Sequence, residues 1–421
     1  MLLCVCKHAI DMKPDPTEKS TPRKPSHAPG RTRAVVVGLD FHDTLFEDRL
    51  AEAVELVNSA GAAVAAVVTG RRAKPDAGTF AGSGKIEEIA ASVAEHGANL
   101  VVFNHQLSPI QIRNIEKIVG MRVIDRTDLI LDIFAQRARS AEGKLQVELA
   151  QMQHLMTRLI RGWTHLERQR GGIGVRGGPG ETQLETDRRL VGERIKRLKE
   201  KLQKLGRQRS TQRAGRMRAG VFNVSIVGYT NAGKSTLFNR MTRSDAYVAD
   251  KLFATLDTTT RKLYIEPGIH VTMSDTVGFI RDLPHTLVAA FHATLTEAME
   301  ADLLLHVVDA ANNMRERQIE DVNLVLAEIG AADILQIIVH NKIDQLEDAP
   351  LGAVLRDESG KIRECRVSAL QGAGMAQLRE TIKEYGLQHQ AGKTLANNHS
   401  GDADAIKEHA ENIAPLGAIL T

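Results

Sequence analysis

Short apolar runs alternate with amphipathic stretches near the start of the chain. The runs AVVVGLD, AAVAAVVTG and GANLVVFN are rich in β-branched residues, and the stretches between them place apolar residues at helical spacing. Because alternating strands and helices are typical of parallel α/β units, the pattern predicts a small parallel α/β domain over residues 34–130. Residues 1–33 are dominated by proline, serine and charge, which predicts a disordered tail.

A narrower apolar pattern follows, in two segments on either side of a glycine-rich stretch. In each segment apolar residues recur every three or four positions, which is typical of a helix with one apolar seam. Two such helices fold back on each other when a loop joins them, so we expect an antiparallel helical hairpin arm over residues 131–218, with 168–189 as its tip. The expected seam residues are Leu145, Leu149, Met152, Met156, Leu159 and Trp163, then Leu184, Val191, Ile195, Leu198, Leu202 and Leu205.

Alternation of strand and helix resumes beyond the hairpin. It predicts a second α/β domain with a doubly wound sheet over residues 219–386, and the polar remainder, 387–421, is expected to be a variable tail. The expected strands are Val221–Val227, Lys262–Glu266, Val271–Ser274, Leu303–Val308, Leu335–His340 and Ile362–Val367.

Charge is distributed unevenly along the 421 residues. The net charge is only +3, but 187–218 holds thirteen Lys/Arg against three Asp/Glu. A solvated helix face is one interpretation of such a run. An anionic partner is the other, because neutralising backbone phosphates releases counterions. Nucleic acid fits better than a membrane, since the narrow apolar seam is already used in helix pairing.

The rest of the composition indicates a soluble protein of a reducing cytoplasm. The three cysteines form no disulfide framework, and the longest apolar run is too short to span a bilayer. We therefore expect no stable membrane insertion. We also expect the protein to be a monomer.

A phosphate-binding loop stands at the start of the second α/β domain. The sequence GYTNAGKS matches G-x-x-x-x-G-K-[ST] and lies between a strand and a helix, as the motif requires. Backbone N–H groups of such a loop face phosphates, its lysine reaches the β- and γ-phosphates, and its serine binds Mg²⁺. The loop residues are Gly228, Tyr229, Thr230, Asn231, Ala232, Gly233, Lys234 and Ser235, followed by Thr236.

Three further motifs follow, each at a strand end. In DTVG, Asp275 is placed to hold the Mg²⁺ shell, and Gly278 to let its amide approach the γ-phosphate. In NKID, a carboxylate on Asp344 accepts two hydrogen bonds from guanine, which adenine cannot donate. In SAL, a backbone N–H donates to guanine O6. The residues concerned are Asp275, Thr276, Val277 and Gly278, then Asn341, Lys342, Ile343 and Asp344, then Ser368, Ala369 and Leu370.

These motifs resemble those of the HflX family of ribosome-associated GTPases. The resemblance covers about 34–386 and includes GKIEEI at 84–89, VVFNHQLSPIQIRNIE at 101–116 and ERQRGGIGVRGGPGETQLETDRR at 167–189. It implies GTP hydrolysis with Mg²⁺, association with the large ribosomal subunit, and splitting or rescue of stalled ribosomes under stress. It also implies that the glycine-rich tip enters ribosomal RNA, with Arg168, Arg170, Arg176, Arg188 and Arg189 contacting phosphates.

The resemblance implies further site residues. The switch I motif corresponds to Phe253, Ala254, Thr255, Leu256 and Asp257, with Thr255 completing the Mg²⁺ shell. Asn231 matches an asparagine that helps to hold K⁺ in related GTPases. Family members also bind ATP at the N-terminal domain, although GSGKIEEI lacks the phosphate-loop motif.

One position departs from other GTPases. Where a glutamine orders the attacking water after D-x-x-G, this chain has Phe279, so we expect slow intrinsic hydrolysis and a ribosome that supplies the missing order. Two alternatives remain: an RNA-remodelling protein that uses ATP as well as GTP, and an RNA-modifying GTPase or one bound peripherally at a membrane.

Overall fold

The structure is a computed structural model that describes residues 32–161, 183–218, 220–243, 252–282, 284, 292–346 and 352–391. The chain divides into two compact units. The first comprises Met1–Ala138 and Val147–Lys196, and the second Arg139–Gln146 and Arg197–Thr421. This division passes through both helices of the expected hairpin, so each hairpin helix contributes to both units.

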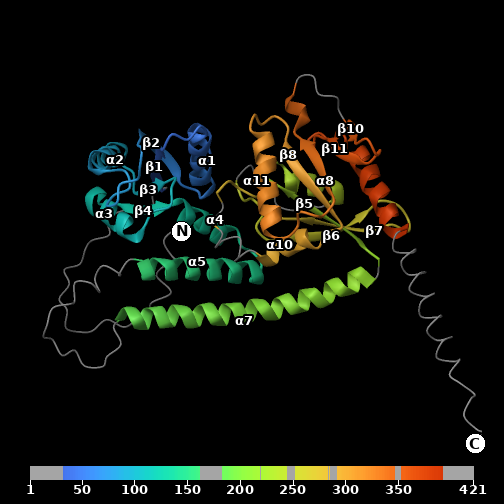
Figure 1. Cartoon of the computed structure of the whole chain (residues 1–421), viewed down its shortest axis with the longest axis horizontal. Helices are drawn as coiled ribbons and strands as arrows, with labels where there is room; N and C mark the ends of the chain where they lie inside the picture. Colours follow the sequence, from blue (N-terminus) through green and yellow to red (C-terminus); the bar gives the residue numbers. More distant parts are fainter. Residues whose placement is uncertain are drawn as a thin grey trace, which may run out of the picture. The chain divides into compact units, whose positions relative to one another are not determined.

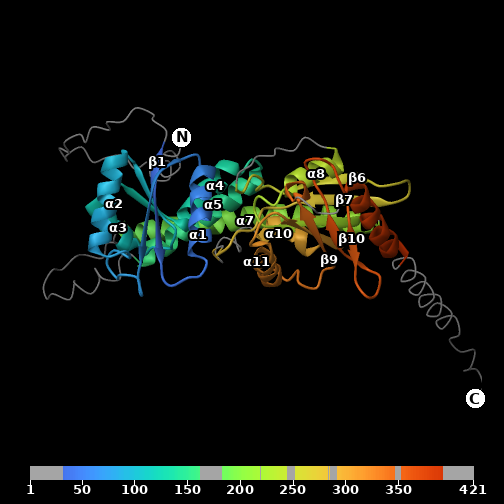
Figure 2. The same ribbon diagram turned by 90° about the horizontal axis from the view of Figure 1, so that it is seen from above.

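The first unit contains a four-stranded parallel sheet in the order β2-β1-β3-β4. Helices α2 and α3 lie on one face of this sheet, and α1 and α4 on the other (Figures 1 and 2). The parallel α/β architecture is the one the sequence predicts. The elements are β1 Arg33–Asp40, α1 Phe46–Ser59, β2 Ala63–Arg71, α2 Ser83–His96, β3 Leu100–Phe103, α3 Pro109–Val119, β4 Arg122–Asp125 and α4 Arg126–Arg137.

Local signals explain where the helices of this unit begin and end. At the start of α3, the Ser108 side chain accepts a hydrogen bond from the Gln111 N–H, and the Gln111 side chain bonds back to the Ser108 N–H. Pro109 occupies the first turn, where no amide hydrogen is needed. Gly120 ends the helix with a φ of 70°, a conformation that glycine adopts without steric cost.

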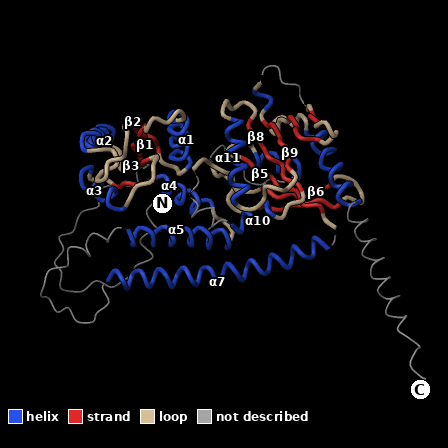
Figure 3. Tube along the Cα trace, viewed as in Figure 1, coloured by secondary structure: helices blue, strands red, loops and turns tan. Residues whose placement is uncertain are grey.

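Two long helices, α5 Ala141–Arg161 and α7 Gln183–Arg218, correspond to the expected hairpin (Figure 3). They run antiparallel, because Glu142 pairs with Arg209 within the second unit while Glu148 pairs with Arg194 within the first. Along the described part of α7, the expected seam positions from Val191 to Leu205 are buried or half-buried, and most of the positions between them are exposed. Trp163 and Leu184 lie outside the residues whose side chains are described.

The second unit contains a seven-stranded sheet in the order β10-β11-β9-β8-β5-β7-β6. Its strands are parallel except for the two at the edges, β6 and β10, which pair antiparallel. The elements are β5 Phe222–Gly228, α8 Lys234–Thr242, β6 Thr259–Tyr264, β7 His270–Asp275, α10 His292–Met299, β8 Leu303–Asp309, α11 Arg315–Glu328, β9 Gln336–Asn341, the 3₁₀ turn η1 Ile343–Gln345, β10 Val354–Arg356 and β11 Ile362–Arg366.

Helices cover both faces of this sheet, as a doubly wound fold requires. Leu237 and Phe238 of α8 share one core cluster with central strand residues such as Ile226, and with Leu378 and Ile382 of the helix over 375–391. Helices α10 and α11 lie on the opposite face from α8 (Figures 1 and 2). The carboxyl ends of β5, β7, β8 and β9 therefore share one edge, where an open α/β sheet binds its ligand.

The sequence locates the central strands better than the element ends. Strands β4 and β10 were not predicted, since each has only three or four residues. The last helix continues to residue 391, beyond the expected end of the domain. Among the described helices, none is both long and apolar enough to cross a membrane.

Candidate nucleotide-binding site

The phosphate loop joins the end of β5 to the start of α8, and its glycines are required by close contacts. At Gly228, with φ of 146°, an added Cβ would lie 2.2 Å from the Val307 carbonyl oxygen. At Gly233, with φ of 91°, it would lie 2.2 Å from the amide nitrogen of Asn341. No larger residue fits either position, so the loop can wrap with its N–H groups turned inward.

Lys234 is the first residue of α8 and is buried, with 6% of its surface exposed. Its Nζ donates to the Tyr229 carbonyl oxygen at 2.7 Å. Burial lowers the pKa of the Lys234 ammonium to about 8, and the nearby Asp275 carboxylate offsets this only in part. Burying this ammonium costs free energy, because among the described residues it donates a hydrogen bond to the Tyr229 carbonyl alone. A bound phosphate would lower that cost by supplying further charged acceptors.

Three hard oxygen ligands converge beside the loop. The Ser235 hydroxyl donates to Asp275 Oδ2 at 2.6 Å and lies 2.7 Å from the Thr255 hydroxyl. Asp275 Oδ1 is buried and has no hydrogen-bond partner within the described part of the chain. Burial raises the pKa of the Asp275 carboxyl, and the Ser235 hydrogen bond and the Lys234 charge counteract only part of this. A buried carboxylate with an unpartnered oxygen, close to the Ser235 hydroxyl, which in turn contacts the Thr255 hydroxyl, fits Mg²⁺, which prefers oxygen ligands.

The other end of the pocket is organised by Asn341. Its Nδ2 donates to the Ala232 carbonyl at 2.9 Å, and its Oδ1 accepts the Ala369 N–H at 2.9 Å. Asn341 therefore ties the phosphate loop to the loop after β11. Near it, Asp344 Oδ1 is buried without a hydrogen-bond partner in the described residues, as expected of an acceptor that awaits a donor from a base.

Lys342 precedes this acceptor and adopts a φ of 63°. Its Nζ pairs with Asp309 at 2.7 Å, which fixes the position of the side chain. The sequence predicts that the Lys342 stem lies along the base, and the residue does line the cavity.

Switch II is held against the phosphate loop by backbone bonds. The Phe279 N–H donates to the Gly228 carbonyl at 3.1 Å, and the Thr230 N–H donates to the Phe279 carbonyl at 2.7 Å. The Phe279 ring is 2% exposed, so it is a packing residue and offers nothing to a water molecule. At Gly278 an added Cβ would lie 2.9 Å from Thr230 Cα, so a larger residue would strain the contact between switch II and the phosphate loop.

One cavity of about 350 Å³ collects most of the predicted residues. Gln345 also lines it and was not predicted, because no motif marks the residue after NKID. The predicted residues that line it are Thr230, Asn231, Gly233, Lys234, Ser235, Thr236, Phe253, Ala254, Thr255, Thr276, Gly278, Asn341, Lys342, Asp344, Ala369 and Leu370. Those that do not line it are Gly228, Tyr229, Ala232, Leu256, Asp257, Asp275, Val277, Ile343 and Ser368.

Several of the non-lining residues support the pocket instead. The Tyr229 hydroxyl accepts the Arg281 N–H at 2.9 Å, and Ile343 is buried under the turn that carries Asp344. Asp257 differs most from expectation. Its carboxylate accepts the backbone N–H groups of Arg139 at 2.7 Å and Ser140 at 2.8 Å, and so takes no part in lining the pocket.

The predicted arm residues are only partly covered by the structure. Arg168, Arg170 and Arg176 lie outside the described residues. Arg188 and Arg189 lie in the first turns of α7, where both are exposed, and Arg189 pairs with Glu193 at 3.2 Å.

Lys85 is the lysine of GSGKIEEI, the segment considered for ATP binding in the N-terminal domain. It is engaged within its own unit, where it donates to the Thr69 carbonyl at 2.9 Å and pairs with Glu88 at 2.6 Å. These contacts give Lys85 a structural role in the first unit.

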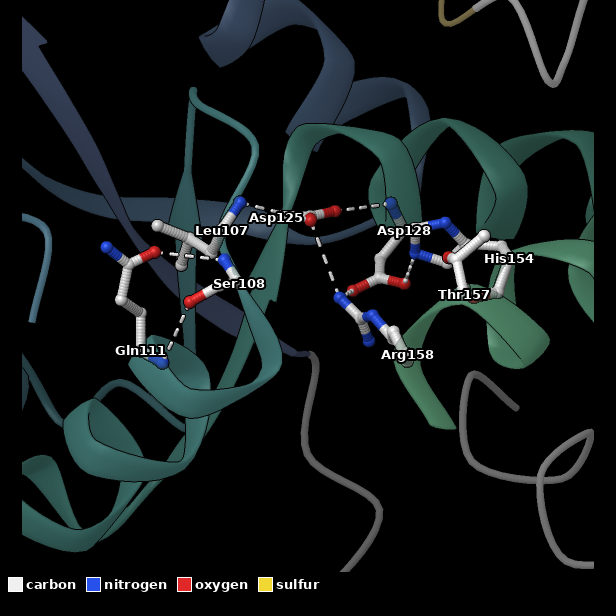
Figure 4. Close-up of polar contacts among 8 residues, drawn as sticks. All are labelled: Leu107, Ser108, Gln111, Asp125, Asp128, His154, Thr157 and Arg158. Carbon is white, nitrogen blue, oxygen red and sulfur yellow. Dashed lines mark hydrogen bonds and ion pairs between the residues drawn. The ribbon is translucent and has the colours of Figure 1, made fainter. Parts of the chain in front are cut away.

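A second polar cluster, in the first unit, was not predicted (Figure 4). Asp125 and Asp128 at the start of α4 face His154 and Arg158 of α5, with Asp128 Oδ1 3.1 Å from His154 Nε2 and Arg158 3.4 Å from Asp125. Burial and the neighbouring Asp128 raise the pKa of Asp125. Burial also tends to raise the pKa of Asp128, but the hydrogen bonds and charges of His154 and Arg158 outweigh it and hold that pKa below the usual value.

The aspartates and the histidine of this cluster have the spacing of metal ligands. The Arg158 guanidinium already contacts both carboxylates, however, and Asp125 also caps α4 through the Asp128 N–H at 2.8 Å. The cluster is therefore an ion-pair network between α5 and α4, in which the Arg158 guanidinium balances the two carboxylates.

The fold and the pocket together define a P-loop protein that binds guanine nucleotides. Comparison with known proteins gives the family. Three family models match: "GTP-binding GTPase N-terminal" over residues 47–135, "GTP-binding GTPase Middle Region" over 137–216 and "50S ribosome-binding GTPase" over 223–342.

Curated relatives agree with these models. The chain is 54% identical to GTPase HflX of Escherichia coli strain K12 over 352 residues, which is 84% of this chain and 82% of that protein. It is 47% identical to GTPase HflX of Magnetococcus marinus over 83% of each chain. Among solved structures, a GTP-binding protein from Sulfolobus solfataricus in complex with GDP is 23% identical, with a TM-score of 0.45 over 85% of this chain and 99% of that one.

The chain belongs to the GTPase HflX family, a family of ribosome-binding GTPases. It binds guanine nucleotide and hydrolyses GTP. The resemblance noted from the sequence motifs is thereby confirmed.

Proposed function

We propose that this chain is a Mg²⁺-dependent GTP switch whose hairpin arm engages RNA of the large ribosomal subunit and which splits or rescues stalled ribosomes under stress. The observation that carries the proposal is the pairing of a guanine-nucleotide pocket with a long basic helix. Helix α7 has most of its Lys and Arg side chains exposed, and its seam positions from Val191 to Leu205 are buried or half-buried. Exposed positive charge of this density suits a nucleic acid.

Different residues of the site bind the phosphates, the Mg²⁺ ion and the guanine base. Lys234 and the loop N–H groups hold the β- and γ-phosphates, while Ser235, Asp275 and Thr255 hold Mg²⁺. Magnesium neutralises the charge that develops on the phosphates during transfer. Asp344 accepts the two guanine donors, and Ala369 offers the neighbouring backbone N–H.

Asn231 is proposed as a ligand for K⁺. It lines the pocket at the phosphate loop and is exposed, so its side chain is accessible to an ion from solvent. Turnover that is equal in sodium and potassium buffers would remove this role.

Hydrolysis needs an ordered water that this chain does not provide through Phe279, whose ring is buried. We propose that docking on the ribosome reshapes switch II and orders that water. Hydrolysis then frees switch I, and the arm changes its affinity for its site.

Co-sedimentation with purified large subunits tests the proposal. The full chain and a variant that lacks Gly171 to Gly180 are each compared with a non-hydrolysable GTP analogue and Mg²⁺. The variant should keep its GTP affinity, since the deleted segment is remote in sequence from the residues that line the pocket, and should lose subunit binding. Normal subunit binding by the variant would contradict the arm's role.

A further inference from the structure

The carboxylate of Asp257 lies at the N-terminus of α5, 118 positions away in sequence from Arg139. Its Oδ2 accepts the backbone N–H groups of Arg139 at 2.7 Å and of Ser140 at 2.8 Å, and its Oδ1 accepts the Ser140 hydroxyl. These groups all belong to the second unit. A negative charge at a helix N-terminus is favourable, because unpaired N–H groups and the helix dipole both point toward it.

Ser140 connects the carboxylate to the helix itself. Its Oγ accepts the Gly143 N–H at 2.8 Å, and its carbonyl accepts the Lys144 N–H at 3.1 Å, so Ser140 is the N-cap of α5. Because the Ser140 hydroxyl donates its hydrogen bond to Asp257, a lone pair of its oxygen is left to accept the Gly143 N–H. The cap of α5 therefore depends on a residue of switch I.

Gly143 makes this approach possible. A Cβ at this position would lie 2.1 Å from Asp257 Oδ1, far inside contact distance. Glycine in the first turns of a helix is unfavourable by about 1 kcal/mol relative to alanine. Its presence is explained by the carboxylate that packs against it.

The same segment reaches the metal site. Thr255, two residues before Asp257, places its hydroxyl 2.7 Å from that of Ser235, and Leu256 between them is 2% exposed. Two residues of chain leave little slack, so a movement of Thr255 away from the metal displaces Asp257 as well.

We propose that Asp257 is a positioning residue that makes the N-cap of α5 depend on the bound nucleotide. The cap is complete while Thr255 is held by Mg²⁺ and the γ-phosphate, and it is lost when switch I relaxes. The proposal rests on the role of Thr255 in the proposed function. Glu142, two residues after Ser140, pairs with Arg209 at 2.9 Å, so the turn that Asp257 caps also contacts α7.

Hydrogen–deuterium exchange on the full chain, without ribosomes, tests this device. With Mg²⁺ and a non-hydrolysable GTP analogue, the amides of Arg139, Ser140 and Gly143 should exchange about fivefold more slowly than with GDP, as expected for an intact N-cap. Equal exchange in the two states would overturn the proposal. Subunit binding that still depends on the nucleotide would then leave the proposed function standing.

Two variants outside the pocket sharpen the test. Ser140→Ala removes the cap hydroxyl, and Gly143→Ala drives the Asp257 carboxylate away while improving helix propensity. Both should keep the wild-type affinity for GDP, whose complex lacks the intact cap, and lose the difference in exchange at position 143. If Gly143→Ala instead slows exchange and preserves the difference, glycine is there for another reason and the device is excluded.

Discussion

The hydroxyl of Thr255 lies 2.7 Å from the hydroxyl of Ser235, which itself donates to Asp275 at 2.6 Å. Of the threonines in and after switch I, Thr255 lines the pocket, whereas Thr260 bonds to Ser274 in the edge hairpin. Thr255 is thus the residue placed to sense a metal and a third phosphate.

Thr255→Ala should lower the rate of GTP hydrolysis by roughly a hundredfold, the usual cost of one lost transition-state contact. GDP affinity should be nearly unchanged, because the contact requires the γ-phosphate. Single-turnover hydrolysis and GDP titration measure the two effects. Thr259→Ala is the matched control, and an equal loss in both variants would contradict the assignment of Thr255.

Lys234→Met should have opposite effects on binding and on stability. GTP affinity should fall about a hundredfold, since a charged contact to phosphate worth about 3 kcal/mol is removed. The thermal midpoint of the nucleotide-free protein should rise, because a buried ammonium whose pKa is lowered to about 8 is replaced by an apolar side chain of similar size. A midpoint that falls would show that Lys234 is better solvated than its burial indicates.

Asp344→Asn should weaken GTP binding by at least about a hundredfold, since an amide cannot accept both guanine donors. Competition titrations with GTP, GDP and ATP measure the change. Any ATP use at the N-terminal domain should survive in this variant, so a parallel loss of GTP and ATP turnover would place both nucleotides in the pocket described here.

The four nucleotide motifs could be predicted from the sequence because each is local. A strand end, a turn and a few side chains fix the positions of Lys234, Asp275 and Asp344, whatever the rest of the chain does. Asp257 could not be placed in this way. Its motif puts it beside the nucleotide, but its partners at Arg139 and Ser140 are far away in sequence and become neighbours only in the folded chain.

The same limit applies to the cluster of Asp125 and Arg158. Each of these residues looks like an ordinary surface charge in the sequence, and packing of α5 against α4 brings them together. Short edge strands such as β10 have too few residues for the alternation of apolar and polar positions to be recognised in the sequence. The apolar seam of α7 could be predicted because apolar residues recur at helical spacing over many residues, so no single position decides the prediction.

Asp132 on α4 gives a pH-dependent prediction. Burial raises the pKa of its carboxyl to about 6, with Arg122 opposing the shift in part. A raised carboxyl pKa means that ionisation costs stability, and the cost appears as pH rises from about 4 to 6 and is complete above 6. Asp132→Asn should therefore stabilise the protein by about 1–2 kcal/mol at pH 8 and have little effect at pH 4.

Chemical unfolding at the two pH values measures this difference. Glu87→Gln, at an exposed position of α2, is the control and should change stability by less than about 0.5 kcal/mol at both. A gain for Asp132→Asn that is the same at pH 4 and pH 8 would show that packing, not charge, explains it.

The burial of Phe279 predicts that large ribosomal subunits accelerate GTP hydrolysis by this chain. Because the buried ring cannot order water, single-turnover hydrolysis by the free chain should be slow and should accelerate by at least about a hundredfold with large subunits. Phe279→Gln should not restore fast hydrolysis, since the site of the side chain faces the core. Equal rates with and without subunits would exclude the ribosome as the activator.

The most direct test of the account is the affinity of the full chain for purified large ribosomal subunits in each nucleotide state. The guanine pocket is proposed to control the arm, so affinity with Mg²⁺ and a non-hydrolysable GTP analogue should exceed that with GDP by at least about tenfold. Identical affinities in the two states would contradict the account, because the pocket and the arm would then act independently.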